Sequence, residues 1–515
     1  GMNKEKISIV WFKKDLRVKD NLALLSASKT NLPVLPLYIF ERDYWKQDFS
    51  SQRHWEFIYD CLIDLNIDLN NIGQSLIIKN GIAKNIFENI IKNYDVQFVF
   101  AHQETGNDWT FVRDEEIRTL FKKNKISFKE FPTNGVVRGL KNRDEWSKIR
   151  NSRMYDGIYE SPKQLIHFDG ITSDQIPDKK NKFLKNKSAG ITQKGGRIEG
   201  LKILNSFLDE RSKNYLKNLS KPEYSIESSS RLSPFLSNGV ISVKEIINEY
   251  RKRKEDNFNT GNLKGLKRNI SAFNSRLSWR CHFIQKLEDQ PQIEFKSMHP
   301  AYEGIRDEFI NELYFKLWKE GRTGFPIIDA CMRSLIHTGW LPFRMRAMLV
   351  SFASYNLLID WKKSGAYLAR LFTDFEPGIH YSQMQMQSGV TGINAIRIYN
   401  PIKQSYDQDQ EGTFIRKWVN ELKHVHAAYI HEPWKMNKNL QEKFKCFIGF
   451  DYPEPIVDQG ESSKFAKNLI YSARKTKNFK KNSEKVFNKL GSRKNNTSSK
   501  RIKNSTNKNQ LSLID

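Results

Sequence analysis

KISIVWF (residues 6–12) is the first of five short apolar runs that decide the fold of the N-terminal part. The other four are LPVLPLYIF (32–40), QSLIIKN (74–80), VQFVFAH (96–102) and ISFKEF (126–131). Amphipathic segments, for example 51–66 and 109–123, separate these runs. Because strands that alternate with helices favour a parallel, doubly wound sheet, we predict an α/β domain over residues 4–132.

Helical periodicity replaces the strand pattern after Gly195. Helices are predicted over GGRIEGLKILNSFLDE (195–210), 241–253, 268–288, 324–339 and 343–363. An all-α domain is therefore expected over residues 196–470. The stretch between the two domains, 133–195, is polar and irregular, and a structureless linker of this length is uncommon. We expect it to wrap the surface.

The charge of the chain points to a polyanionic partner. The formal net charge is +27 over 515 residues. From Arg474 to the end, 13 Lys and Arg stand against two acidic residues, so 27 minus 11 leaves +16 elsewhere. Nucleic acid is the simplest partner for such a protein. The basic tail, 471–515, is expected to be disordered, and a role as a charged solubilising extension stays open.

Several classes of protein are excluded by what the sequence lacks. Its four cysteines are far apart and include no C-x-x-C pair, so neither a disulfide framework nor a metal site is expected. No run of 18 apolar residues and no N-terminal apolar signal segment occurs. We therefore expect a cytoplasmic monomer that does not contact membranes.

Two segments concentrate polar chemistry. FTDFEPGIHYSQMQMQSGVTG (372–392) places Asp374, Glu376 and His380 within seven positions. ESSSRLSPFLSNG (227–239) places serines and Arg231 before a helical pattern, where hydroxyls and free backbone N–H groups can bind an anion. A plain helix N-cap is the alternative for the serine segment.

Arginines interrupt two otherwise apolar helical patterns. In AFNSRLSWRCHF (272–283), Arg276 and Arg280 share a helix face with Phe273, which either faces a ligand or forms a solvated charged edge. In GWLPFRMRAML (339–349), Arg346 lies in a strongly apolar run and should need a carboxylate partner. Asp374 is the candidate, and a purely structural pair is the alternative.

These segments together resemble the photolyase/cryptochrome family of flavoproteins. The resemblance rests on VWFKKDLRVKDNLAL (10–24), SSSRLSPFLSNGVIS (228–242), GRTGFPIIDACMRSLIHTGWLPFRMR (321–346), LLIDWKKSGAYLARLFTD (357–374) and RIYNPIKQSYDQDQEGTFIRKWVNEL (397–422). It implies an N-terminal α/β antenna domain and a helical domain that binds FAD. The antenna could be a folate, a deazaflavin or a flavin, and nothing in the sequence selects one.

The resemblance also implies roles for single residues. The residues that it assigns to FAD are Tyr215, Ser229, Ser230, Arg231, Leu232, Ser233, Phe273, Arg280, Arg346, Asp374, Glu376 and His380. His380 falls where a side chain faces flavin N5 in the family. The residues assigned to DNA are Arg276, Trp279, Phe343, Arg344 and Met384, and those assigned to the light reaction are Arg276, Trp279, His380 and Trp361.

Several positions depart from the family pattern. Enzymes of the family that split cyclobutane dimers usually have Glu in place of Arg276 and Asn in place of Phe343. The family's tryptophan relay keeps only Trp361, because Met384 and Glu308 replace the inner and outer members. Alternative relay residues are Tyr381, Trp318, Tyr314 and Tyr367.

The leading hypothesis is FAD-dependent, blue-light-driven repair of pyrimidine lesions in UV-damaged DNA. In the family, excited reduced flavin passes an electron to the lesion, which is first flipped out of the duplex. A cryptochrome-type photoreceptor without repair activity is the main alternative. A flavoprotein of this fold with another nucleic-acid or redox role is the third.

Overall fold

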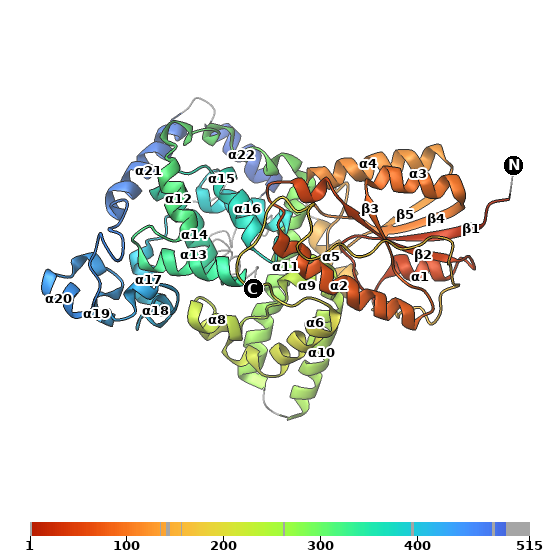
Figure 1. Cartoon of the computed structure of the whole chain (residues 1–515), viewed down its shortest axis with the longest axis horizontal. Helices are drawn as coiled ribbons and strands as arrows, with labels where there is room; N and C mark the ends of the chain where they lie inside the picture. Colours follow the sequence, from red (N-terminus) through yellow and green to blue (C-terminus); the bar gives the residue numbers. More distant parts are fainter. Residues whose placement is uncertain are drawn as a thin grey trace.

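A computed structural model describes residues 3–133, 135–140, 145–155, 157–260, 263–392, 396–475 and 479–490. Its N-terminal part is a five-stranded parallel sheet of order β3-β2-β1-β4-β5 (Figure 1). The strands are β1 Lys6–Phe12, β2 Val34–Glu41, β3 Ile77–Gly81, β4 Asp95–His102 and β5 Ser127–Phe131. All five predicted strands are confirmed within three residues at each end, and so is the α/β class.

Helices cover both faces of this sheet, as a doubly wound fold requires. They are α1 Leu22–Ser28, α2 Gln52–Asn71, α3 Ala83–Asn93 and α4 Asp108–Lys123. Helices α3 and α4 pack on one face through Phe87 and Phe121, while α1 and α2 pack on the other through Leu24 and Trp55. The apolar strands are buried between these layers.

The segment after β5 follows the surface of the α/β part and then reaches the helical part. Its described residues include one α-helix, α5 Trp146–Tyr155. The N–H of Leu165 donates to the carbonyl of Ile72 at 2.8 Å, and that of Ile191 donates to the carbonyl of His337 at 2.8 Å. Residues 134, 141–144 and 156 of this segment lie outside the described residues.

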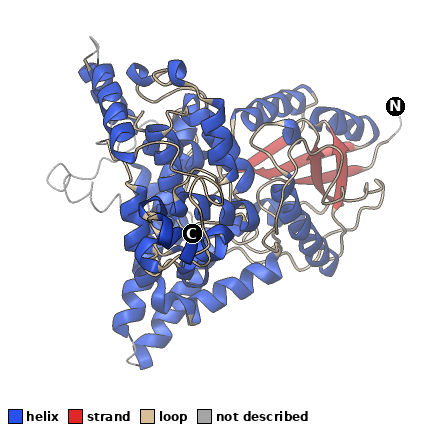
Figure 2. Ribbon diagram, turned by 60° about the vertical axis from the view of Figure 1, so that its left-hand side comes forward, coloured by secondary structure: helices blue, strands red, loops and turns tan. Residues whose placement is uncertain are grey.

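Helices make up the rest of the described chain (Figure 2). The longer ones are α6 Arg197–Asp209, α10 Val243–Thr260, α11 Leu263–Asp289, α12 Glu312–Glu320, α13 Pro326–Thr338, α14 Phe343–Ser351, α15 Trp361–Leu371, α16 Pro377–Ser388, α17 Pro401–Gln408, α21 Gln459–Arg474 and α22 Phe479–Leu490. The shorter α-helices are α7 Tyr215–Asn218, α8 Pro222–Ser228, α9 Ser233–Ser237, α18 Thr413–Trp418, α19 Ala427–Ile430 and α20 Lys438–Lys443. Helix α16 packs against α11, α14 and α15, so its side chains lie at the centre of this part. Among the described residues, no helix combines the length and apolar character needed to span a bilayer.

Two predictions about this part were wrong. The single helix expected over 343–363 is broken, because α14 passes into a π-helical turn, η7 Phe352–Asn356, and Leu358 adopts a left-handed φ of 52°. Helix α15 then starts afresh at the Asp360 N-cap, whose side chain accepts from the N–H of Lys362. Disorder was expected over 471–515, yet α22 is helical and its Val486 packs against the cluster of Leu287 and Ile293. Residues 476–478 and 491–515 of the tail lie outside the described residues.

Candidate functional site

Arg346 and Asp374 form a buried, bidentate ion pair between α14 and the loop that leads into α16. Nη1 and Nη2 of Arg346 lie 2.8 and 2.9 Å from the two carboxylate oxygens. Its Nε donates to the carbonyl of Leu341 at 2.7 Å. The side chains are only 4% and 2% exposed. The predicted pairing of Arg346 with Asp374 is therefore confirmed, and its burial makes it costly to break.

A second buried ion pair joins α11 to the start of α16. Arg280 Nη2 lies 3.0 Å from Glu376 Oε2, and Glu376 is the residue just before Pro377, the first of α16. Burial raises the pKa of the Glu376 carboxyl, although Arg280 and Lys14 oppose that shift. Both Arg276 and Arg280 are buried, so the alternative of a solvated charged edge on this helix is wrong.

His380 is buried one turn into α16. Its Nε2 lies 2.8 Å from the carbonyl oxygen of Gly365 in α15. Since a carbonyl can only accept, Nε2 carries the hydrogen and Nδ1 is the bare nitrogen of the neutral ring. Burial lowers the pKa of His380 from 6.5 to about 4, and the charge of Arg346 lowers it further. The ring is therefore neutral at physiological pH.

Acid is expected to destabilise the fold through His380. As the pH falls below 6.5, the unfolded chain takes up a proton on this ring, which the folded protein accepts only near pH 4. The contribution of His380 to the free energy of unfolding is therefore fully present above pH 6.5 and is lost as the pH falls toward 4. The slope from this group is at most about 1.4 kcal/mol per pH unit. Urea unfolding at neutral and at mildly acidic pH measures it.

The variant His380→Asn should flatten this dependence, and His424→Asn, at an exposed position, should leave it unchanged. The flattening is partial, because burial also lowers the pKa of His54 to about 3. An undiminished slope in His380→Asn would show that the folded protein does not hold this ring neutral.

The serine segment carries a half-buried positive charge. Arg231 adopts a left-handed φ of 60°, its guanidinium lies 4.6 Å from the ring centroid of Trp340, and Nη2 donates to Gln193 Oε1 at 3.0 Å. Burial lowers the pKa of Arg231 to about 10; Asp374 opposes the shift, and Arg346 and Arg211 add to it. One carboxylate among three arginines leaves a site suited to an anion.

The serines do not act as a simple cap of α9. Leu232 occupies the N-cap position, and Ser230 Oγ accepts from its N–H at 3.3 Å. The carbonyls of Ser229 and Ser230 accept from Arg211, a contact that sequence patterns did not predict. Ser233 is buried at the first position of α9. Arg211 thus holds the backbone of this segment, and the serine side chains are buried.

The residues assigned to DNA are split between the helix surface and the core. Trp279 is half-buried on α11, with its ring centroid 5.0 Å from that of His282. Arg276 is buried, and its guanidinium lies 4.2 Å from the ring centroid of Tyr215. Arg344 Nε donates to Ser220 Oγ at 2.9 Å. Phe343, Met384 and Trp361 all lie inside the helical core, as do Tyr215 and Phe273 in the neighbouring cluster.

Several buried donor atoms around these pairs meet no acceptor within the described part of the chain. They are Ser229 Oγ, Arg231 Nε, Arg280 Nε, Trp340 Nε1 and Gln383 Nε2. Buried donors are almost always satisfied in folded proteins. A ligand rich in acceptors, with phosphate oxygens at one end and ring carbonyls and nitrogens at the other, fits this donor set, and FAD is such a ligand.

Sequence patterns did not indicate Trp340, Gln193 or the Gly365 carbonyl as part of this arrangement. Trp340 and Gln193 contact Arg231 across long stretches of sequence, and the third group belongs to the backbone. The sequence offered one signal for Trp340, because this residue lies just before the helix predicted to begin at residue 343. It offered none for the other two groups. In the described residues, no group of three or more His, Cys, Asp or Glu side chains could hold a metal ion.

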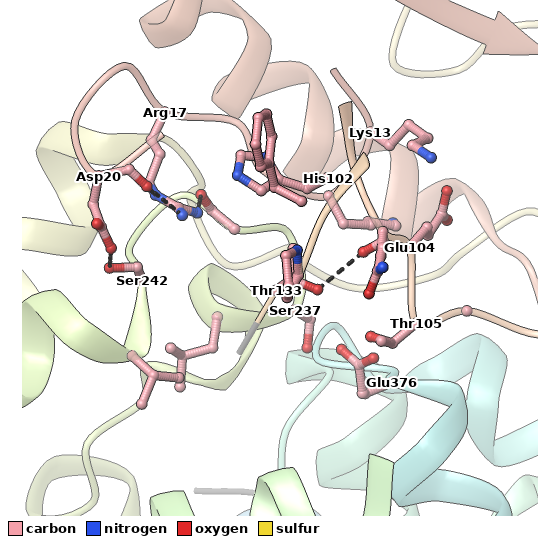
Figure 3. Close-up of a pocket in the computed structure, with 18 of the residues that line it drawn as sticks. Lys13, Arg17, Asp20, His102, Glu104, Thr105, Thr133, Ser237, Ser242 and Glu376 are labelled. Atoms are coloured by element: carbon pink, nitrogen blue, oxygen red, sulfur yellow. Dashed lines mark hydrogen bonds between the residues drawn. The ribbon is translucent and has the colours of Figure 1, made fainter. Parts of the chain in front are cut away.

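A cavity of about 250 Å³ lies at the junction of the two parts, at the carboxyl ends of β1, β4 and β5 (Figure 3). Arg17 and Asp20 line it and are held in place, since Arg17 donates to the carbonyl of Gly239 at 2.9 Å and Asp20 accepts from the Ser242 hydroxyl at 2.6 Å. Glu376 also lines it. The strand order reverses between β1 and β4, which is where open α/β sheets bind ligands.

Two family models match the chain. The model "DNA photolyase" matches residues 8–143, and the model "FAD binding domain of DNA photolyase" matches residues 273–472. Together they cover the α/β part and most of the helical part, including both ion pairs and His380.

Individual relatives extend over nearly the whole chain. A deoxyribodipyrimidine photo-lyase of Streptomyces griseus is 28% identical over 88% of this chain and 97% of its own length. A cryptochrome DASH of Gloeobacter violaceus is 25% identical over 91% of this chain and 96% of its own. The crystal structure of a bacterial class III photolyase from Agrobacterium tumefaciens is 26% identical, covers 92% of this chain and 99% of that chain, and superposes with a TM-score of 0.77.

Proposed function

Because the chain belongs to the photolyase/cryptochrome family and carries its FAD-binding domain, we propose that it repairs UV-induced pyrimidine lesions in DNA with blue light. The observation that carries this proposal is Trp279. It is half-buried, not sealed in the core, and lies one residue before Arg280, whose partner Glu376 belongs to the buried polar site. An aromatic ring there can stack on a base that has left the duplex.

The residues proposed to hold FAD divide into two groups. Ser229, Ser230 and Arg231 would bind the diphosphate, with Arg211 fixing their backbone. The Arg346–Asp374 pair and His380 would bind the flavin end. When bound, FAD supplies the light absorption and the electron that splits the lesion.

The protein side of this chemistry is orientation and exclusion of water. Arg346 and Asp374 neutralise each other, so the buried site gains fixed hydrogen-bond directions without a large net charge. His380 stays neutral, with its tautomer set by the Gly365 carbonyl. The Nδ1 atom can then accept a hydrogen bond but cannot donate one.

Recognition of the lesion is proposed to rest on Trp279 for stacking and on Arg276 and Arg344 for charge. Arg276 stands where dimer-splitting relatives have Glu, and a guanidinium can pair bidentately with a base edge or a phosphate. Phe343 and Met384, assigned to DNA on the resemblance alone, would act only by packing behind this surface, since both are 2% exposed.

Preferential binding of damaged DNA tests this assignment of the substrate. We expect tighter binding to an oligonucleotide duplex with one thymine dimer than to the same duplex undamaged, because a distorted base pair costs less to open. Affinity for both should fall steeply with salt, as expected for a chain of net charge +27. Fluorescence anisotropy over a salt series measures both effects, and equal affinities at every salt concentration would contradict the proposal.

A photoreceptor of cryptochrome type is the second candidate. The observation in its favour is the replacement of two lesion contacts, by Arg276 and by the buried Phe343, together with the cryptochrome DASH relative. Arg276→Glu separates the two. Dimer splitting that appears only in this variant would mean that the natural pocket has another task.

The cavity at the carboxyl ends of β1, β4 and β5 is proposed to hold the antenna chromophore. It lies at the switch point of the sheet, and Glu376 is shared between its wall and the proposed FAD site. A folate, a deazaflavin and a flavin are the candidates. The absorption spectrum of the purified protein distinguishes them.

A further inference from the structure

We propose that a row of aromatic side chains conducts electrons from Trp109 at the surface, across the junction between the α/β and helical parts, to the flavin site at His380. The inference rests on the proposed function, because it needs a flavin there as the electron acceptor. The row begins in the helical part with three rings in mutual contact. The ring centroid of His380 lies 5.2 Å from that of Phe375 and 5.7 Å from that of Tyr381, and the latter two lie 6.2 Å apart.

Phe375 carries the row across the junction. Its ring centroid lies 5.0 Å from that of Phe49, which belongs to the α/β part, and 5.6 Å from the stacked ring of His54. His54 is held in place, because its Nε2 lies 2.8 Å from the carbonyl of Ala369 and 3.0 Å from that of Phe372. These distances are those of ordinary aromatic packing, so the junction offers unbroken π contact.

Tyr44 and Trp109 take the row to the surface. The ring centroid of Tyr44 lies 5.9 Å from Phe49 and 5.7 Å from Trp109. A side branch runs from Tyr44 to the buried Trp45, 5.1 Å away. Trp109 is half-buried and lines a surface cleft of about 390 Å³ together with Phe295. A small reductant from solution can reach it there.

The chemistry of the rings sets the direction of flow. Indole and phenol rings can lose one electron, whereas Phe49, Phe375 and His380 serve as bridges. Burial raises the pKa of Tyr44 and of Tyr381, so both phenols are protonated in the resting protein. The oxidised state is assigned to Trp109 because this indole lies at the solvent end of the row, where it lines the surface cleft.

Electrons and atoms balance with an external thiol. The indole of Trp109 loses one electron, and the light-excited, oxidised flavin gains one. A thiol in solution returns one electron to Trp109 and releases its proton to water. Two thiols oxidised in this way join through a sulfur–sulfur bond as a disulfide.

The route through the helical core lacks a continuous series of ring contacts among the described residues. Met384 stands at the inner position of the family's relay, and the outer position, Glu308, is an exposed carboxylate. Trp361 is only 1% exposed. Trp318 and Tyr367 contact each other at 5.9 Å, but among the described residues no chain of ring contacts joins them to His380.

Photoreduction of the purified flavoprotein tests the row. Wild type and the variants Trp109→Phe, Tyr44→Phe, Trp361→Phe and Trp434→Phe are illuminated with blue light and excess thiol, and the flavin absorbance is followed. We expect Trp109→Phe and Tyr44→Phe to lose most of the photoreduction rate and the distant control Trp434→Phe to stay close to wild type. Trp361→Phe, which interrupts the rival route through the helical core, should lose much less of the rate than Trp109→Phe. Electron paramagnetic resonance with ring-deuterated tryptophan should show a radical that disappears in Trp109→Phe.

Photoreduction that survives in Tyr44→Phe and fails in Trp361→Phe would overturn the inference, as would a tryptophan radical that persists in Trp109→Phe. Chemical reduction with dithionite bypasses the row, so all four variants can also be assayed for lesion splitting without it. Failure of splitting after chemical reduction counts against the proposed function. Failure of photoreduction alone concerns only the route of the electron.

Discussion

Asp374→Ala is expected to lower the free energy of unfolding by about 3–5 kcal/mol, because it leaves the buried guanidinium of Arg346 without its partner. Two charge-assisted hydrogen bonds, of 2.8 and 2.9 Å, are lost in a place that water does not reach. Urea or guanidinium unfolding measures the change. The flavin content of the purified variant should fall as well, because the proposed flavin end of the site rests on this pair.

The matched control is Asp43→Ala. Asp43 pairs with Lys46 at 3.5 Å, but its side chain is 55% exposed and that of Lys46 63%. An exposed pair of this kind contributes between about 0 and 1 kcal/mol. If Asp374→Ala unfolds at the same denaturant concentration as the control, the Arg346–Asp374 pair does not stabilise the fold by the expected amount.

Trp279→Ala is expected to weaken binding of a dimer-containing oligonucleotide by about 1–3 kcal/mol, the value of one base–aromatic stacking contact. That is a loss of about fivefold to 150-fold in affinity. Affinity for the undamaged duplex should change little, because that duplex stays closed and meets the protein mainly through phosphates. Anisotropy titrations with both oligonucleotides measure the difference.

Two further variants make the Trp279 result specific. Trp279→Phe keeps an aromatic face and should retain most of the preference for damage. Trp434→Ala removes a partly buried tryptophan that packs on Phe325 and is distant in sequence from Trp279. This variant should leave the preference for damaged DNA unchanged. A Trp279→Ala protein that still discriminates as well as wild type would remove the main support for lesion stacking.

The fold of the N-terminal part could be predicted from the sequence because each strand is a short apolar run with a clear break on either side. The helical part was predicted less well where no Gly or Pro marks an interruption. The segment Phe352–Leu358 reads as a helix, yet the chain forms a π-helical turn and a left-handed residue there. Such a break depends on packing in the core, which a local pattern does not contain.

The contacts of the candidate site were likewise predictable only in part. The Arg346–Asp374 pair was predictable, because an arginine in an apolar helix needs a carboxylate and Asp374 was the candidate. The contact of His380 with the Gly365 carbonyl was not predictable, since any residue at that position offers the same backbone oxygen. The aromatic row likewise forms only when the segment between β2 and α2, the loop before α16, and α4 are brought together.

The central claim, light-driven repair, is tested most directly with fully reduced protein and a defined thymine-dimer oligonucleotide, single- and double-stranded, under blue light and in the dark. Chemical reduction makes the result independent of any electron route through the protein. We predict that the dimer is split in the light and not in the dark. Bound, excited flavin that reverses neither the dimer nor a (6-4) photoproduct would contradict the account.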